Sequence, residues 1–237
     1  SDRRVREAMN IAINRADIVK GIMLGNAKPA YTFIDPQALD FAESTKGIIK
    51  EDVERAKKLL DEAGWKVGAD GIREKDGMKL APKVYFTQVA YFGRVSEAIQ
   101  GYMRQIGIDW KVQGFDSTIA FSKMSEQDYE IWTVTFPYMS AGDLLNFYFD
   151  SKNIPAPNRM NWNDPQTDEY LKKGKAALSA ADRAKYYALA QQRVTEEHLW
   201  MPVMNIDMYV TSLKKLKGVR PHMLYQNTFY KGLDYSF

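Results

Sequence analysis

Apolar residues recur at the spacing of an α-helix along much of the chain, which predicts several amphipathic helices. The pattern is clearest over residues 51–63, where one face carries an apolar stripe made of Val53, Ala56, Leu59, Leu60 and Ala63. Gly64 follows at the position where a glycine commonly ends a helix. The same spacing over residues 95–106, followed by Gly107, predicts a second helix.

Residues that cap helices mark where other helices begin. Asp2 and Asn14 precede two short apolar repeats, so we predict two consecutive helices at the start of the chain. Asp164 is followed by a proline, which suits the first position of a helix. Ser179 and the acid three residues later predict a long helix that runs through His198.

Three short segments in the middle of the chain predict β-strands. Residues 84–87 are apolar, and residues 108–113 alternate apolar with polar side chains. Residues 129–136 are apolar almost throughout, which is typical of a central strand buried on both faces. With helices at 95–106 and 116–126 between them, the order predicts an α/β layer of parallel strands joined by right-handed crossovers.

Two Asp-Gly pairs, at residues 70–71 and 76–77, predict the tight turns of a β-hairpin. Their acids do not have the spacing of a calcium-binding loop, so we expect no metal site there. Residues 201–210 predict an extended segment, and a turn-rich stretch completes the chain.

Composition narrows the class of protein. The chain has 237 residues, 45% hydrophobic and 27% charged, as in an ordinary soluble globular protein. Its 33 basic and 30 acidic residues are interspersed, so we expect no nucleic-acid partner. There is no cysteine, which excludes disulfides and thiolate chemistry, and no apolar run reaches the ~20 residues of a membrane span. Because neither a signal peptide nor an initiator Met is present, we expect a processed chain or an excised fragment.

Catalytic signatures are not found in the sequence, and we expect no catalytic residues and no cofactor. The two histidines, His198 and His222, have no partner at triad or metal spacing, and we interpret His198 as a helix-end cation that complements the dipole. Asp128 and Glu130 flank Tyr129 where the predicted central strand begins. One of these acids could face a cleft, but we expect a structural role because no acid–base partner is nearby.

Aromatic side chains gather where the predicted central strand ends. Trp132, Phe136, Tyr138, Met139 and Asp143 all lie at this point. In open α/β sheets, ligands bind beyond the carboxyl ends of the strands. Aromatic and Met side chains with one carboxylate suit an amphipathic small molecule. We therefore expect the loop after this strand to form one wall of a solvent-filled groove.

Several segments together resemble the family 5 solute-binding proteins, the receptors of oligopeptide, dipeptide and nickel ABC importers. Arg4-Val5-Arg6 with Ala12-Ile13-Asn14-Arg15 resembles that family's "RVRxAxxxAIDR" segment. Five further motifs follow in the family's order, at residues 56–65, 70–77, 103–108, 128–130 and 200–203.

The resemblance implies an α/β fold, a type II periplasmic-binding-protein-like lobe with a mixed, mostly parallel sheet flanked by helices. Family members close two lobes around a ligand and are considerably longer than this chain. Residues 1–207 would then form the C-terminal ligand-binding lobe, and residues 208–237 would return to an N-terminal lobe that is mostly absent. The implied location is periplasmic, or extracytoplasmic and membrane-associated. The implied partners are a small-molecule or peptide ligand, the transmembrane permease subunits and the missing lobe.

The chain departs from the family's peptide receptors at one point. These commonly place an Asp after the strand to pair with the α-amine of the ligand. Alignment on residues 128–130 puts Met139 there, and the next acid is Asp143. The resemblance therefore implies a peptide or a related solute, such as a capped peptide, an opine or a sugar conjugate.

We expect ligand contacts from aromatic rings and two polar anchors. The predicted ligand-binding residues are Tyr31, Trp132, Phe136, Tyr138, Met139, Asp143 and Asn146. Two alternatives stay open. One is a hydrolase or transferase that uses carboxylates such as Asp128 or Asp143, and the other is a sensor or adaptor domain.

Overall fold

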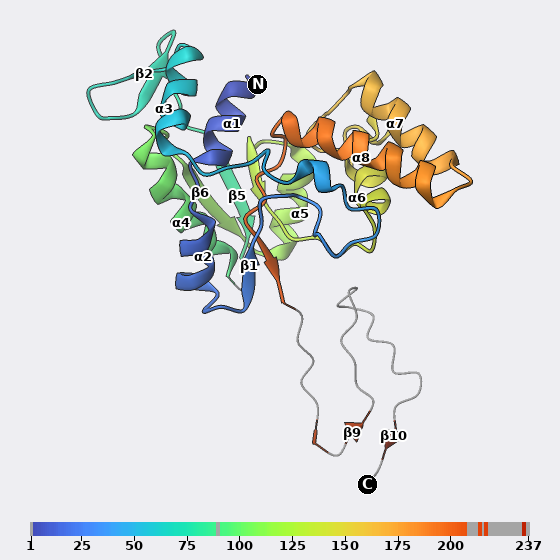
Figure 1. The fold of residues 1–237 in the computed structure, drawn as a ribbon. Coiled ribbons are helices and arrows are strands. Elements are labelled where there is room, and N and C mark those ends of the chain that lie inside the picture. The colour runs from blue at the N-terminus through green and yellow to red at the C-terminus, as the bar shows by residue number, and fades with distance from the viewer. Residues whose placement is uncertain (1, 89–90, 208–212, 215, 218–233, 236–237) are drawn as a thin grey trace.

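The computed structural model describes residues 2–88, 91–207, 213–214, 216–217 and 234–235. His222 and most of residues 208–237 lie outside these ranges. Within them the chain forms two halves, one built around a parallel sheet and the other built from helices, as Figure 1 shows. Each half has its own core of buried apolar side chains.

The sheet-containing half confirms the predicted alternation of strands and helices. Its elements in chain order are α1 (Arg3–Ile11), α2 (Arg15–Ile22), α3 (Val53–Glu62), β5 (Lys83–Thr87), α4 (Phe92–Gln105), β6 (Lys111–Phe115), α5 (Ser117–Glu126) and β7 (Ile131–Thr133). The strands are parallel in the order β6-β5-β7. The apolar faces of α1, α3 and α4 pack with Val84, Ile108 and Trp110 into one core.

The expectation of a central, doubly buried strand over residues 129–136 is wrong. β7 covers only residues 131–133 and lies at the edge of the described sheet, because it pairs with β5 alone. All three of its residues are half-buried, and Val134 just beyond it is 40% exposed. β5 occupies the centre instead, with Val84 and Tyr85 buried.

A three-stranded antiparallel meander confirms the predicted hairpin. It consists of β2 (Lys66–Val67), β3 (Arg73–Lys75) and β4 (Met78–Lys79). Asp76 and Gly77 have φ of 52° and 76°, the left-handed pair that a tight hairpin turn needs. Arg73 anchors the meander, because its buried guanidinium donates to the Ile106 carbonyl at 2.8 Å and to the Trp65 carbonyl at 2.7 Å.

The helical half is formed by α6 (Ala141–Tyr148), α7 (Pro165–Ala176) and α8 (Ala180–Glu196). Two 3₁₀ turns, η1 (Glu43–Thr45) and η2 (Ser151–Asn153), lie beside these helices. Two further antiparallel pairs complete the described structure: β1 (Ala27–Pro29) with β8 (Met204–Ile206), and β9 (Leu216–Lys217) with β10 (Asp234–Tyr235). No helix in the described ranges is long and apolar enough to cross a membrane.

The predicted caps begin four helices. Asp2, Asn14, Asp164 and Ser179 each accept a hydrogen bond from a backbone N–H in the first turn of α1, α2, α7 and α8. The end of α8 differs from the prediction, because the helix stops at Glu196 and does not include His198. His198 has φ of 51° and is only 4% exposed, and burial lowers its pKa to about 4, so it is uncharged at neutral pH and is not the predicted helix-end cation.

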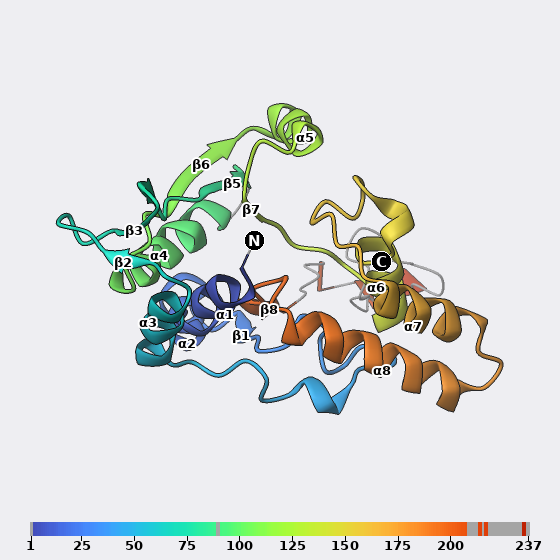
Figure 2. The same cartoon turned by 90° about the horizontal axis from the view of Figure 1, so that it is seen from above.

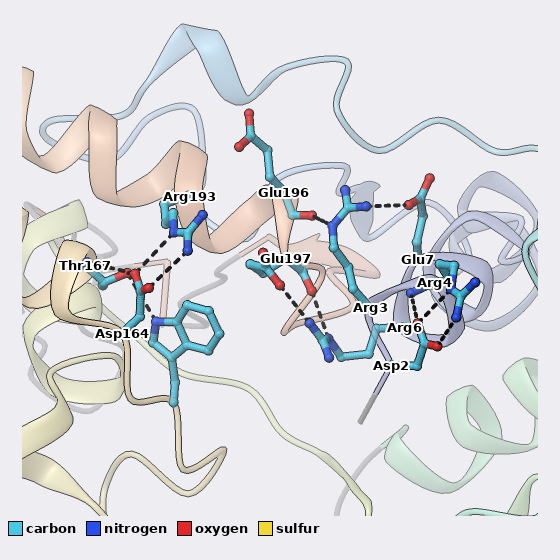
Figure 3. A network of polar contacts seen from close by, with 11 residues as sticks. Asp2, Arg3, Arg4, Arg6, Glu7, Asp164, Thr167, Arg193, Glu196 and Glu197 are labelled. Carbon is cyan, nitrogen blue, oxygen red and sulfur yellow. Dashed lines mark hydrogen bonds and ion pairs between the residues drawn. The ribbon is translucent and has the colours of Figure 1, made fainter. Parts of the chain in front are cut away.

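Polar side chains of the first two helices hold the segment that leaves α8. Four of them donate to backbone carbonyls of residues 196–202: Arg3 to Glu196 at 2.6 Å, Arg6 to Glu197 at 2.8 Å, Asn10 to Trp200 at 2.8 Å and Arg15 to Pro202 at 2.8 Å. Figure 3 shows the first two of these contacts. Arg6 and Arg15 of the motif, together with Arg3 and Asn10, therefore join the two halves of the molecule.

A second polar cluster fixes α8 to the start of α7. Asp164 accepts two hydrogen bonds from Arg193, at 3.0 and 3.2 Å, and also bonds to Thr167 (Figure 3). Arg193 and these hydrogen bonds hold the pKa of Asp164 below its usual value, against the effect of burial. Carboxylate and guanidinium are both charged at neutral pH, which favours this packing of α7 on α8.

Tight packing of α7 on α8 gives a testable prediction. A Cβ at Gly174 would lie 2.8 Å from the ring of the buried Tyr187. We expect Gly174→Ala to lower the free energy of unfolding by about 1–3 kcal/mol, because the ring would have to move. Gly101→Ala in α4 is the matched control, since nothing lies within 4 Å of its Cβ, and it should gain up to ~1 kcal/mol from helix propensity. Equal stability of the two variants in urea titrations would contradict this packing.

Candidate functional site

The segment after β7 connects the two halves of the molecule. Residues 134–140, called the crossing loop below, leave the sheet at β7 and enter α6 in the helical half (Figure 2). Phe136 in this loop lies 4.5 Å from Tyr148 and is stacked on Trp200 at 6.1 Å, measured between ring centres. Phe136 thus packs against two rings from outside the loop that the sequence did not indicate, whereas Trp132, which the sequence placed in the same cluster, packs against Tyr85 and Tyr129.

Neighbouring backbone holds the crossing loop in place. The Tyr138 hydroxyl accepts a hydrogen bond from the Asp35 N–H and lies 3.4 Å from the Phe33 carbonyl. Burial raises the pKa of Tyr138 to about 12, so this hydroxyl stays protonated. The backbone of Leu39 pairs with the backbone on both sides of Ser140. Its N–H donates to the Met139 carbonyl, and its carbonyl accepts from the Ala141 N–H. The Met139 side chain stays 47% exposed, which leaves it available for contact.

Asp143 and Asn146 lie on α6, and both form hydrogen bonds within the helical half. Asp143 and Ser140 form a reciprocal capping box with two 3.0 Å hydrogen bonds. Asn146 donates to the Gly142 carbonyl at 2.7 Å and to the Tyr187 hydroxyl at 2.9 Å. Both residues line a hollow of about 540 Å³ whose other walls include the ion pair of Asp40 with Arg183.

Tyr31 lines a different hollow of similar volume. Its hydroxyl donates to Glu51 at 2.9 Å, and the Arg15 guanidinium lies 5.3 Å from its ring centre. Lys46 and Lys50 also line this hollow, which shares no lining residue with the hollow at α6. The structure therefore does not bring Tyr31 together with Asp143 and Asn146.

Trp132 lies on the face of the sheet that also carries Tyr85, its partner in register. Its ring is 5.0 Å from Tyr129 and 5.9 Å from Tyr85, measured between centres. The indole N–H of Trp132 is buried and has no hydrogen-bond partner, and the same holds for Nε of Arg159. Sequence reasoning missed Arg159, because a single arginine in an irregular, Asn- and Pro-rich stretch carries no pattern.

The acids considered for catalysis are paired within the structure. Asp128 binds Lys83 Nζ at 2.6 Å, which holds the pKa of this carboxyl below its usual value. Glu130 accepts from the Lys83 backbone N–H at 2.7 Å. Asp128 is therefore a poor proton donor at neutral pH. Within the described ranges, no three His, Asp or Glu side chains come together as metal ligands.

The fold is periplasmic-binding-protein-like. It superposes on the oligopeptide-binding protein AppA from Bacillus subtilis, solved with a nonapeptide, with a TM-score of 0.81 and 21% identity. It also superposes on NikA from Brucella suis, solved with Fe(III)-EDTA, with a TM-score of 0.79 and 22% identity. These alignments cover 100% and 99% of this chain and 48% of each of those chains.

Sequence comparison then assigns the family. Residues 1–156 match the model of the bacterial extracellular solute-binding proteins, family 5 Middle, and the chain belongs to this family. AppA of Bacillus subtilis is 23% identical over 235 residues, 93% of this chain and 42% of that protein. The oligopeptide-binding protein OppA of Lactococcus lactis is 36% identical over 132 residues, 53% of this chain and 20% of that protein. The chain thus spans less than half the length of these relatives.

Proposed function

We propose that this chain is the ligand-binding lobe of the receptor of an ABC importer, and that it binds a peptide or a related amphipathic solute. Its family membership over residues 1–156, which include the whole parallel sheet and the crossing loop, carries the proposal. The relatives' names, oligopeptide-, dipeptide- and nickel-binding proteins, support a transport role. On this proposal the protein works outside the cytoplasmic membrane, and membrane-bound permease subunits are its partners.

The proposed site is a cleft between this lobe and the rest of the receptor. Residues 1–207 would form the lobe, and residues 208–237 would return to the other lobe. Phe136, Tyr138 and Met139 would supply the wall on this side, with Trp132, Asp143, Asn146 and Tyr31 as further candidates. Binding of the solute would favour the closed arrangement of the lobes, which the permease recognises.

A charge placed on the crossing loop tests the proposal. We expect Met139→Arg to weaken solute binding at least about tenfold, or about 1.4 kcal/mol, because a guanidinium would enter an apolar wall. Since the Met139 side chain is 47% exposed, the fold should tolerate the change. Leu178→Arg is the matched control, because Leu178 is fully exposed in the turn between α7 and α8.

The measurement is made on the full-length protein in two steps. Native mass spectrometry first identifies the small molecules that co-purify with it, and calorimetry then compares their affinities for the variants. Equal affinity of Met139→Arg and Leu178→Arg would contradict the placement of the cleft. Turnover of peptides or glycosides at a rate that Asp128→Asn abolishes would favour the hydrolase instead.

A further inference from the structure

Residues 35–42, between β1 and α3, form hydrogen bonds both to the crossing loop and to α8, and are called the strap below. Figure 1 draws this segment in blue, beside α6 and α8. Ala38 in the strap is buried in the core of the helical half, whereas its neighbour Leu39 is 57% exposed. The strap belongs to no helix or strand, so its position depends on the bonds that it forms with its neighbours.

One set of bonds joins the strap to the crossing loop. The Asp35 N–H donates to the Tyr138 hydroxyl. The Leu39 N–H donates to the Met139 carbonyl at 3.3 Å, and the Leu39 carbonyl accepts from the Ala141 N–H at 2.9 Å. Tyr138 and Met139 belong to the proposed wall of the cleft. The strap therefore fixes the crossing loop at the point where the solute is proposed to bind.

A second set of bonds joins the strap to α8 through Gln191, whose side chain is completely buried. Its side-chain oxygen accepts from the Ala42 N–H at 3.0 Å, and its side-chain nitrogen donates to the carbonyls of Asp40 at 2.7 Å and Tyr187 at 3.1 Å. Buried backbone groups are costly when they have no partner, so loss of this amide would destabilise the strap at two positions. One residue of α8 thus holds the strap on both sides of Phe41.

An ion pair holds the strap at the same point. The Asp40 side chain is 5% exposed and accepts from Nε of Arg183 at 2.7 Å and from its Nη2 at 3.3 Å. Asp40 has φ of 60°, a left-handed conformation that Asp adopts more readily than most residues. Leu39 and Asp40 also line the hollow at α6. Because these two residues are adjacent, a displacement of Asp40 from α8 would disturb the bonds of Leu39 to the crossing loop.

We propose that the strap positions the crossing loop for the solute, and that Gln191 is a positioning residue of the binding site although it lies outside the crossing loop. Gln191 acts through Asp40 and Leu39. A wall that is fixed before binding loses less conformational freedom when the solute arrives, so loosening it weakens binding. The proposal rests on the proposed receptor function and adds to it a residue that determines affinity without belonging to the proposed wall.

Hydrogen exchange and peptide capture, both measured on the full-length protein, test this role. We expect fragments that contain Leu39 and Ala141 to exchange at least about tenfold faster in Gln191→Met than in the wild type, because local opening of the strap exposes their N–H groups. For capture, co-purified solute is removed by unfolding and refolding, and the protein is incubated with a protein hydrolysate. Native mass spectrometry then measures the bound peptides, and we expect at least about fivefold less capture by Gln191→Met.

Two further variants separate this role from a general loss of stability. Arg193→Met is the matched control, because Arg193 also lies on α8 but bonds to Asp164 at the start of α7. It should leave both the exchange of the strap and the capture at wild-type values. Asp40→Asn removes the ion pair and tolerates the left-handed backbone, so it tests the strap if Gln191→Met fails to fold. It should change exchange and capture in the same direction as Gln191→Met.

The outcomes distinguish this inference from the proposed function. Wild-type exchange at Leu39 and Ala141 in both strap variants would overturn the strap as the support of the crossing loop. Faster exchange with unchanged capture would overturn the positioning role of Gln191 and leave the receptor function standing. If the wild type captures no peptide from the hydrolysate, peptide binding itself is contradicted, and this inference with it.

Discussion

We expect Arg15→Met to lower the free energy of unfolding by about 3–5 kcal/mol, one of the largest effects of any single substitution in this chain. The Arg15 side chain is completely buried, and burial lowers its pKa to about 10, so it stays charged at neutral pH. Its guanidinium donates to the carbonyls of Pro202, Ile13 and Asn10 and to the Asn10 side chain, at 2.7–3.0 Å. Methionine fills a similar volume but leaves these four acceptors without a donor.

Arg94→Met is the matched control for this prediction, because Arg94 is an exposed residue of α4. We expect its free energy of unfolding to stay within about 0.5 kcal/mol of the wild type. Denaturant titration of both variants measures the difference. A loss below about 1 kcal/mol for Arg15→Met would show that water or neighbouring donors replace the guanidinium, and that these bonds do not join the two halves.

Local signals in the sequence predicted the local structure well. Asp2, Asn14, Asp164 and Ser179 begin helices as expected, because a capping side chain acts within one turn of its own position. The Asp76-Gly77 turn forms for the same reason, since its two positive φ angles suit these residues. The order of strands and helices along the chain was then sufficient to predict a parallel sheet.

Features that depend on distant partners were not predictable in the same way. The apolar residues 129–136 fit the pattern of a central strand, but the strand in this segment, β7, pairs with β5 alone. Phe136 lies beyond the strand and packs against Trp200. His198 was interpreted as a helix-end cation, because nothing in the sequence shows that Asn10 lies 3.4 Å from its ring. The motif that indicated the family contains Arg6 and Arg15, but the carbonyls of Glu197 and Pro202 that they also bind lie more than 180 residues away.

In the candidate site, too, local features were predictable from the sequence and contacts with distant residues were not. The sequence predicted one aromatic cluster after β7, but Phe136 packs against Tyr148 and Trp200, while the Tyr138 hydroxyl is held by the backbone N–H of Asp35. The sequence did not show that Asp143 belongs to the capping box of α6. That capping box forms only because the backbone of Ser140 is extended, so that the Ser140 N–H meets the Asp143 carboxylate. Nor did it indicate Arg159, whose buried Nε has no hydrogen-bond partner in the structure.

The buried histidine gives a prediction for stability as a function of pH. Burial, followed by the positive charges of Arg3, Arg6 and Arg15, lowers the pKa of His198 from 6.5 to about 4. The unfolded chain therefore binds this proton more tightly than the folded chain does, and protonation favours unfolding. The stability should be complete above pH 6.5 and fall by about 1.4 kcal/mol per pH unit between pH 6.5 and 4. The total loss from this group is about 3 kcal/mol, and it levels off below pH 4.

His198→Asn isolates this contribution from the other titrating groups. Asparagine tolerates the left-handed backbone at this position, where φ is 51°, and it does not titrate. We expect the stability difference between wild type and His198→Asn to be constant above pH 7 and to shift by about 3 kcal/mol against the wild type by pH 4. Proton NMR of the imidazole provides the direct check. A ring resonance of His198 that titrates near pH 6.5 would mean that the ring is open to water and that the bonds from Asn10 and the arginines to residues 196–202 do not enclose it.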